Sequence, residues 1–349
     1  MLGYREGGNN GGPFNSHLRI SQSRLSDKYQ FVSLVLPKNS SGLRSIIAII
    51  KMAIEIKRAK ADIVQIPGLG LMGFFMAISC RLTKTKSILA IHGSSTQAIE
   101  FNKNILKKHL IRIIEILTLK MTTISFGVSN FVSTIDIIKR YARNYYGCIY
   151  NMTHITKPTK TRTEIRNELS INENSIVVIS TGRITIEKGY ETIADLIQLY
   201  KNNKNVKFVI AGDGDYRKTM EHRLESQIKS SQVHMLGYRN DVNDLLEGAD
   251  IFIIASKHET LCMSLQEAGI AGVASVASDI GGIREIIDDG INGYLVPSFN
   301  PIDFKIRIDK LITDSRTRSQ FAHNLKRKCQ VRFSNSEIVK HLDYLYSSI

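Results

Sequence analysis

Short apolar runs alternate with amphipathic segments along the first half of the chain. Each run has four to six residues, which suits strands that are buried on both faces of a parallel sheet. The amphipathic segments have the length and spacing of helices that cover such a sheet. We expect strands at residues 31–36, 63–66 and 88–91, and helices at residues 43–59 and 73–82.

The second half repeats this alternation. Strands are expected at residues 176–180, 206–211, 233–236, 251–255 and 274–277, and helices at residues 190–202, 216–229, 242–247 and 265–271. The pattern is typical of doubly wound α/β domains, in which ligands bind at the carboxyl ends of the strands. Residues that carry chemistry should therefore directly follow the strands.

A polar stretch separates the two alternating blocks. Residues 154–174 contain one proline and no apolar run, which is the composition of a linker. A chain of 349 residues is long enough for two domains. We therefore predict an N-terminal domain at residues 1–152, a linker at residues 153–174 and a second domain at residues 175–333. Residues 334–349 are expected to form an amphipathic helix.

Positive charge is concentrated in the first half. The net charge is +15, and residues 1–150 contribute +14 of it, with 21 Lys and Arg against 7 Asp and Glu. Such asymmetry indicates that the first half faces a polyanion, either an anionic lipid surface or a nucleic acid. No zinc-finger spacing or aromatic RNA-binding motif accompanies the charge, so nucleic acid is the less favoured partner.

Cysteine spacing and apolar segments indicate the compartment. The four cysteines are far apart and show no CxxC spacing, which argues against a structural zinc site and against a disulfide framework. The start of the sequence lacks the apolar core of a signal peptide. The longest uncharged stretch, residues 63–80, contains a proline and three glycines, so a strand and a helix start are favoured over a membrane span. We expect a cytoplasmic protein.

The most informative motif is SKHETLCMSLQEAGIAG at residues 256–272, directly after a predicted strand. Glu259 falls in the loop and Glu267 on the following helix. This placement suits hydrogen bonds to hydroxyl groups at two points of an extended ligand, and does not suit a glycosidase pair that flanks one bond. The backbone N–H groups of the helix start can hold a phosphate between them. The alternative is one capping and one solvated glutamate.

Two cations follow an earlier strand. Arg183 and Lys188 lie in the loop of STGRITIEKGYETI, residues 180–193. A planar guanidinium and an ammonium point charge together suit a diphosphate. They would also stabilise the negative charge that develops on a departing diphosphate, a task that a metal performs elsewhere. The alternative is a pair of solvated surface cations.

The first half carries weaker signals. Gly11 and Gly12 precede an expected helix, and glycine lets the backbone approach a phosphate closely; a flexible terminal segment is the alternative. His92 follows a strand, so it either meets a ligand or is a satisfied structural histidine.

The GxGxxG pattern of residues 68–73 also follows a strand, but the next strand lacks the terminal acid of a dinucleotide site. We expect no such site there.

In order and spacing, the motifs of residues 180–297 resemble the retaining glycosyltransferases of family 4, which have the GT-B fold. They are GRITIEKG, VIAGDGDYR, MLGYRNDVNDLL, GADIFIIASKHE, LQEAGIAG and SDIGGIREIIDDGINGYLVP. Weaker matches in the first half are GGP at residues 11–13, IHG at 91–93, GVSNF at 127–131, and Asn151. The resemblance implies two Rossmann-like, doubly wound α/β domains that face each other across a cleft, with the C-terminal helix returning to the N-terminal domain.

The resemblance also implies roles for single residues. Glu259 would contact hydroxyl groups of the transferred sugar, and Glu267 the ribose of the nucleotide. Further expected contacts are Arg183 and Lys188 with the diphosphate, Gly11 and Gly12 with the same diphosphate, His92 with the sugar near its reacting carbon, and Leu261 and Cys262 through their backbone amides. The implied reaction transfers a sugar from a nucleotide-sugar with retention at the anomeric carbon. It would need neither a metal nor a cofactor.

Two positions depart from the family pattern. The run Thr260–Leu261–Cys262 replaces a Gly, an aromatic or aliphatic residue, and a Pro or Gly, which leaves the donor preference open. Only residues 1–4 precede the glycine-rich segment where the family has a full strand. We expect either a very short first strand or a chain that begins late relative to a longer gene product.

Residues 103–121 predict an amphipathic basic helix. Such a helix can lie on an anionic bilayer surface, or it can pack on the core with a solvated cationic face. Because similar enzymes act on lipid-linked acceptors, the implied acceptor is a lipid-linked saccharide of surface polysaccharide synthesis, at the inner face of the cytoplasmic membrane. The alternatives are a nucleotide-sugar epimerase of GT-B architecture and a non-catalytic, membrane-associated accessory subunit.

Overall fold

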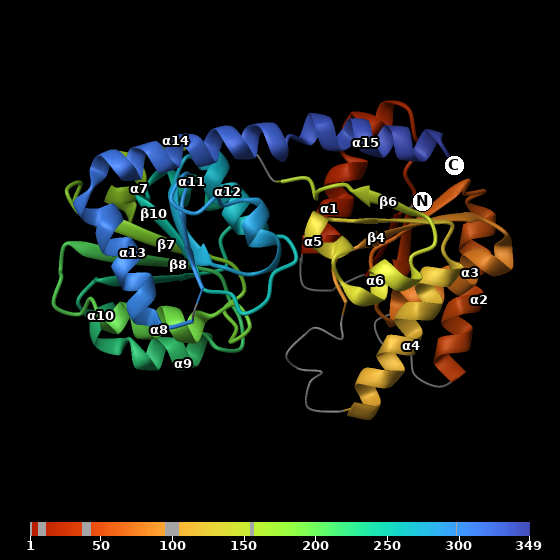
Figure 1. Cartoon of the computed structure of the whole chain (residues 1–349), viewed down its shortest axis with the longest axis horizontal. Helices are drawn as coiled ribbons and strands as arrows, with labels where there is room; N and C mark the ends of the chain where they lie inside the picture. Colours follow the sequence, from red (N-terminus) through yellow and green to blue (C-terminus); the bar gives the residue numbers. More distant parts are fainter. Residues whose placement is uncertain (1, 6–11, 37–42, 95–104, 154–156, 298) are drawn as a thin grey trace. The chain divides into compact units, whose positions relative to one another are not determined.

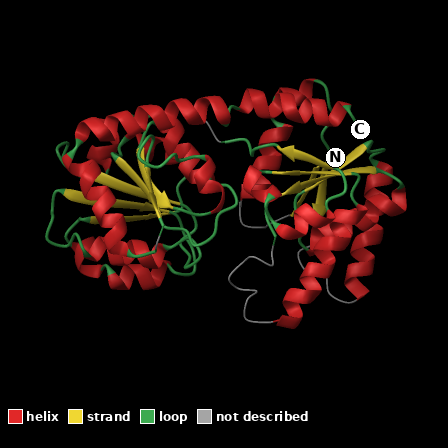
Figure 2. Ribbon diagram, in the orientation of Figure 1, coloured by secondary structure: helices red, strands yellow, loops and turns green. Residues whose placement is uncertain are grey.

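The computed structural model describes residues 2–5, 12–36, 43–94, 105–153, 157–297 and 299–349 (Figure 1). The chain divides into two compact units. Unit 1 comprises Met1–Met152 together with Ser334–Ile349, and unit 2 comprises Thr153–Phe333. Each unit contains one six-stranded parallel sheet with helices on both of its faces (Figure 2).

The sheet of unit 1 has the strand order of a doubly wound domain. The order is β2 (Ser33–Leu36), β1 (Leu2–Arg5), β3 (Ile63–Ile66), β4 (Lys86–Ile91), β5 (Ile124–Gly127) and β6 (Tyr145–Cys148). The first strand is therefore present although it is short, and it pairs in parallel with all four residues of β2. In the central strand β4, Ile88 and Leu89 are fully buried on opposite faces, as a continuous apolar run predicts.

The helices of unit 1 divide between the two faces of its sheet. One face carries α1 (Gly12–Ser21), the 3₁₀ turn η1 (Arg24–Asp27) and α15 (Asn335–Ser347), and the other carries α2 (Leu43–Arg58), α3 (Leu71–Thr83) and α4 (Ile105–Met121) (Figure 1). Helix α3 packs against both α2 and α4. Two short helices, α5 (Asn130–Ser133) and α6 (Asp136–Tyr141), lie between β5 and β6.

The C-terminal helix returns to unit 1, which confirms the expectation from the resemblance. Tyr346 of α15 donates a hydrogen bond to Gln65 of β3. Its ring meets the Tyr29 ring edge-on at 5.3 Å, and the Tyr29 hydroxyl donates to Asp343 at 2.7 Å. These contacts tie the end of the chain to the sheet of the first unit.

The sheet of unit 2 contains every strand that the apolar runs predicted. Its order is β12 (Tyr294–Val296), β11 (Ala274–Ser278), β10 (Ile251–Ile254), β7 (Ile176–Thr181), β8 (Val206–Ala211) and β9 (Val233–Gly237). The five predicted strands differ from the observed ones by at most one residue at an end. The edge strand β12 was not predicted, because its three residues are too short a pattern to recognise.

The helices of unit 2 differ more from the prediction. After α7 (Arg162–Glu168), the described helices are α8 (Tyr190–Gln198), α9 (Arg217–Arg223), α10 (Glu225–Lys229), α11 (Val242–Glu247), α12 (Met263–Ala271), α13 (Pro301–Thr313) and α14 (Ser315–Arg332), with the 3₁₀ turn η4 at Gly281–Glu285. Helix α8 ends before the asparagine-rich residues 199–205, whose side chains favour turns. The helix predicted at residues 216–229 is divided at Leu224, which is fully buried.

The polar segment at residues 153–174, expected as a linker, is part of unit 2. It contains a helix, α7 (Arg162–Glu168), which begins with a capping box formed by Thr161 and Glu164. Ile165 on this helix is buried. The prediction of a simple linker was therefore wrong.

Arg166 explains why a polar segment can belong to a core. Its side chain is only 1% exposed, and its Nη2 lies 2.8 Å from the Asp250 carboxylate. It also donates hydrogen bonds to the carbonyl groups of Gly248 and Ser175. Polar composition here reflects a buried ion pair with satisfied donors, not solvation.

We expect Arg166→Leu to lower the free energy of unfolding of unit 2 by about 3–5 kcal/mol, because it leaves the Asp250 carboxylate without its buried partner. Arg162 supplies a matched control: it pairs with the same carboxylate at 2.7 Å, but its side chain is 38% exposed. Arg162→Leu should cost about 1 kcal/mol or less. Urea unfolding of both variants measures the difference, and equal losses would contradict the buried role of Arg166.

Candidate functional site

Two loops of unit 2 meet at the carboxyl ends of neighbouring strands β7 and β10. The contact depends on Gly189, at the start of α8. Its φ is +73°, and a Cβ at this position would lie 1.8 Å from the carbonyl oxygen of Ala255, the residue after β10. Only glycine combines this conformation with so close an approach. The loop that carries Arg183 and Lys188 is thereby held against the loop that carries Glu259.

Lys188 and Glu259 form an ion pair between these loops. The Lys188 Nζ lies 2.6 Å from Glu259 Oε1, and the Ser256 hydroxyl donates to the same oxygen at 3.0 Å. Burial alone would lower the pKa of Lys188, but the charge and hydrogen bond of Glu259, together with the nearby Cys262 and Glu187, outweigh it and the pKa is raised. Lys188 is therefore fully protonated at neutral pH. Two residues selected independently from the sequence are direct partners.

The second carboxylate oxygen of Glu259 is the candidate acceptor for a ligand. Glu259 is 7% exposed, and its Oε2 accepts no hydrogen bond from the residues that the structure describes. Oxygen atoms of an ionised carboxylate accept hydrogen bonds only. The arrangement can therefore accept a hydroxyl group of a ligand while Lys188 and Ser256 hold the carboxylate in place.

Arg183 lies in the same loop and is exposed. Within the described parts of the chain, its guanidinium makes no hydrogen bond and no ion pair. A guanidinium that is not engaged by a carboxylate is ready to bind a phosphate in a bidentate manner. The loop thus offers one paired and one unpaired cation after β7.

The motif after β10 continues into helix α12. Cys262 is the N-cap of this helix and Leu261 precedes it; both are buried. Burial raises the pKa of the Cys262 thiol to about 12, so the thiol stays protonated and is no nucleophile. Glu267 is half-buried in the second turn of α12.

A second glycine, which the sequence reasoning did not single out, fixes this motif from the other side. Gly282 donates its N–H to the Glu259 carbonyl at 3.1 Å. A Cβ on Gly282 would lie 1.9 Å from the Thr260 carbonyl oxygen. The two glycines of SDIGGI were the sequence signal that could have identified this contact. The contact itself could not be predicted, because it requires β10 and β11 to be neighbours in the sheet.

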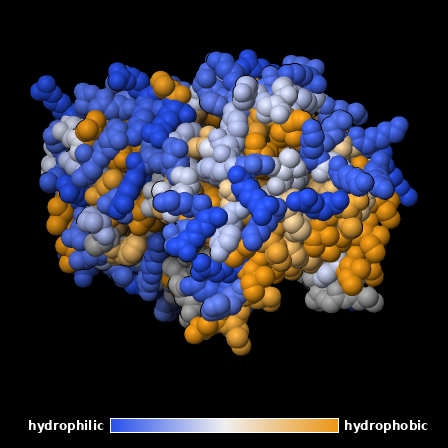
Figure 3. Space-filling view, turned by 45° about the vertical axis from the view of Figure 1, so that its right-hand side comes forward, coloured by the Kyte–Doolittle hydropathy of each residue, from blue (hydrophilic) through white to orange (hydrophobic). Residues whose placement is uncertain are grey.

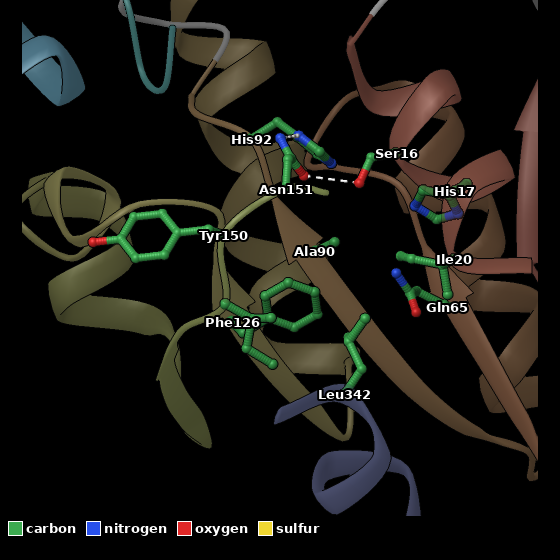
Figure 4. Close-up of a pocket in the computed structure, with 11 residues that line it drawn as sticks. Ser16, His17, Ile20, Gln65, Ala90, His92, Phe126, Tyr150, Asn151 and Leu342 are labelled. Atoms are coloured by element: carbon green, nitrogen blue, oxygen red, sulfur yellow. Dashed lines mark hydrogen bonds between the residues drawn. The ribbon is translucent and has the colours of Figure 1, made fainter. Parts of the chain in front are cut away.

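The residues predicted in unit 1 have different placements. Gly11 lies outside the described residues, and Gly12 is the first residue of α1. His92 follows β4 and lines a small pocket in unit 1 (Figure 4). The roles that the resemblance gave to these three residues stay predictions.

The pocket around His92 is polar on one side and apolar on the other. It is lined by α1, the central strands, residues 149–151 and Leu342 of α15 (Figure 4). Burial lowers the pKa of His92 to about 3 and that of His17, on α1, to about 4. Both imidazoles are therefore neutral at physiological pH.

Metal-ligating side chains do not gather in the described parts of the molecule. No group of three or more His, Cys, Asp or Glu residues is placed there to hold an ion. The four cysteines are free thiols.

Comparison with known families decides the identity of the second unit. Residues 161–328 match the family model of glycosyl transferases group 1. These residues, about half of the chain, are similar in sequence to that family. The matched region contains Arg183, Lys188, Glu259 and Glu267, and it begins at the capping box of α7.

Curated relatives extend the similarity to most of the chain. The UDP-Gal:alpha-D-GlcNAc-diphosphoundecaprenol alpha-1,3-galactosyltransferase of Escherichia coli is 25% identical over 317 residues, covering 88% of this chain and 80% of that protein. An uncharacterized glycosyltransferase of Methanocaldococcus jannaschii is 28% identical over 52% of this chain. The chain spans about half the length of that relative, 47%.

Solved structures share the fold of both units. Anabaena HepE, solved in complex with UDP and glucose, has a TM-score of 0.83 at 18% identity and covers 100% of this chain and 99% of its own. A glycosyltransferase from Rickettsia africae has a TM-score of 0.77 at 17% identity, over 99% and 97% of the two chains. The expected GT-B fold, with two Rossmann-like domains of which the second contains the group 1 match, is confirmed.

Proposed function

We propose that this protein is a retaining glycosyltransferase that transfers a sugar from a nucleotide-diphosphate sugar to an acceptor without a bound metal or cofactor. The observation that carries the proposal is the Lys188–Glu259 pair beside the exposed Arg183, at the carboxyl ends of β7 and β10. It supplies cations for a diphosphate and a carboxylate oxygen for a sugar hydroxyl within one group 1 domain.

The charges support a specific division of roles. Arg183 binds the diphosphate through its planar guanidinium, and Lys188 adds a point charge that Glu259 holds in position. Both cations stabilise the negative charge that develops as the nucleoside diphosphate departs. Glu259 accepts a hydroxyl of the transferred sugar, and Glu267 a hydroxyl of the ribose. Retention follows if the donor phosphate assists deprotonation of the acceptor on the face from which the diphosphate leaves.

The names of two relatives support a lipid-linked saccharide as the acceptor. The Escherichia coli relative is named for transfer to a diphosphoundecaprenol-linked sugar. A Campylobacter jejuni relative, 31% identical over 45% of this chain and 40% of its own, is named for N-acetylgalactosamine transfer to N,N'-diacetylbacillosaminyl-diphospho-undecaprenol. We therefore propose surface polysaccharide synthesis at the inner face of the cytoplasmic membrane.

The donor is tested by turnover of a panel of UDP-, GDP- and ADP-sugars with EDTA present. We expect slow hydrolysis of one donor and its loss, by about 100-fold or more, in Glu259→Gln, because the hydroxyl of the reacting sugar loses its charged acceptor. Glu191→Gln is the matched control, since the Glu191 carboxylate pairs with Lys257 at 3.3 Å and not with Lys188. Epimerised donor would instead indicate an epimerase. No turnover and no nucleotide binding would indicate an accessory subunit.

The helices on one face of unit 1 support contact with a membrane surface. Within the described part of the chain, no helix combines the length and apolar character needed to cross a bilayer. Helix α4, however, exposes an apolar stripe at Leu106, Leu110, Ile113 and Leu117, of which Leu106 is 84% exposed. This spacing places the four side chains on one side of a helix. Figure 3 shows apolar side chains gathered on unit 1.

Helix α2 adds a second exposed stripe that the sequence reasoning did not identify. Ala48, Met52 and Ile56 face the core, whereas Ile50 and Ile54 point outward, 50% and 44% exposed. Each of α2 and α4 carries four basic residues and one acid. The acid of α4, Glu115, is buried, so the outer face of α4 is cationic and apolar. Together these faces suit the interface of an anionic bilayer.

We expect the protein to bind vesicles that contain phosphatidylglycerol more tightly than neutral phosphatidylcholine vesicles. The triple variant Leu106→Ser, Leu110→Ser, Ile113→Ser should bind at least about tenfold more weakly, because it removes apolar area from the interface. The control is Ile302→Ser, Ile306→Ser on α13 of unit 2, where the side chains are similarly exposed at 54% and 50%. Co-sedimentation with vesicles measures the binding of both variants. If the triple variant binds as tightly as the control variant, the stripe on α4 is not a membrane-binding surface.

A further inference from the structure

A chain of polar contacts connects helix α1 to His92 through Asn151. The Ser16 hydroxyl donates to Asn151 Oδ1 at 3.0 Å, and both residues are buried. Asn151 Nδ2 lies 3.5 Å from His92 Nδ1. Figure 4 shows the amide side chain between the Ser16 hydroxyl and the imidazole. Three residues that are distant in sequence therefore share one network at the pocket of unit 1.

Helix α1 holds the backbone next to Asn151 as well as its side chain. Arg19, one turn after Ser16 on the same helix, donates from Nη1 to the Met152 carbonyl at 2.6 Å. The two contacts of α1 leave the Asn151 side chain little freedom to turn, because its backbone and its amide are both fixed. The orientation of the amide toward His92 is thus a property of the fold.

The orientation of the Asn151 amide decides which nitrogen of the His92 imidazole carries the proton. An amide oxygen only accepts and an amide nitrogen only donates. In the structure Oδ1 accepts from Ser16 and Nδ2 faces His92. A neutral imidazole that faces an amide N–H at Nδ1 offers its lone pair there and acts as the acceptor. The remaining proton is on Nε2.

We propose that Asn151, oriented by Ser16, is a positioning residue that holds His92 in the tautomer protonated at Nε2, so that His92 donates a hydrogen bond from Nε2 to an oxygen of the bound sugar. The inference deepens the proposed function and rests on it for the nature of the ligand. Ser16 and Asn151 act through His92 and need not touch the sugar themselves.

The surroundings of Nε2 support a donor role. This atom is buried and has no partner among the residues that the structure describes. A buried N–H without a partner costs free energy, and a ligand oxygen at that place removes the cost. A site built in this way discriminates strongly between a ligand that offers the oxygen and an analogue that lacks it.

The tautomer can be read without any turnover, from the ring nitrogen shifts of the full-length protein with ¹⁵N-labelled histidine. His92→Gln identifies the signals of His92. We expect wild type to carry the proton on Nε2. In Asn151→Asp, a carboxylate of nearly the same shape can only accept, so the proton should move to Nδ1. Ser21→Ala is the matched control, since the Ser21 hydroxyl of α1 donates to the Leu18 carbonyl and to no other described residue, and the substitution should leave the tautomer unchanged.

Donor turnover supplies the second measurement. Asn151→Asp should lower kcat for donor hydrolysis by about 100-fold or more with little change in KM. The Nε2 atom would then carry a lone pair and could not donate a hydrogen bond to the sugar oxygen. Ser16→Ala should show a smaller loss, with a mixture of both tautomers. Unchanged thermal unfolding of both variants separates these effects from a folding defect.

Two results would overturn the inference: a wild-type His92 protonated at Nδ1, which means that the Asn151 amide is turned over, or an Asn151→Asp protein that keeps the wild-type tautomer. Neither depends on the identity of the reaction. If no donor is turned over by wild type while the tautomer changes as expected, the proposed function fails and the positioning role of Asn151 stands.

Discussion

The ion pair between Lys188 and Glu259 is the interaction on which the candidate donor site depends. It joins the loops after β7 and β10, and it brings an ammonium and a carboxylate together at 2.6 Å. Taking two such charges out of water is costly unless further hydrogen bonds satisfy them. Ser256 supplies one such bond to the carboxylate. The pair and its hydrogen bond hold the two charges in fixed orientations, which suits a site that stabilises a developing charge.

Glycine residues make this pairing possible. Gly189 allows the first loop to lie directly on Ala255, and Gly282 allows the segment after β11 to lie on Thr260. A side chain at either position would place its Cβ 1.8 or 1.9 Å from a carbonyl oxygen, so the two backbone segments would have to move apart. The precision of the site is thus set by backbone contacts at the ends of adjacent parallel strands.

The sequence predicted five of the six strands of the unit 2 sheet, and the loops that carry Arg183, Lys188 and Glu259, because buried parallel strands are uniformly apolar and ligands bind where such strands end. The pairing of Lys188 with Glu259 was not predicted, since it depends on β7 and β10 being neighbours. Residues 153–174 were misassigned because polarity was taken as solvation, whereas Arg166 is buried on Asp250. On α2, the outward isoleucines were missed because an apolar periodicity usually marks a core face.

Nucleotide binding by calorimetry, with EDTA present, tests most directly whether the loops after β7 and β10 hold a diphosphate. One of UDP, GDP and ADP should bind to wild type, and Arg183→Ala should weaken it at least about tenfold, since a bidentate, charge-assisted contact is lost. Lys257→Ala removes a cation near the same loops that is already paired with Glu191, and should bind as wild type does. Equal affinities of wild type and Arg183→Ala, or no binding of any of the three nucleotides, would contradict the proposed donor site.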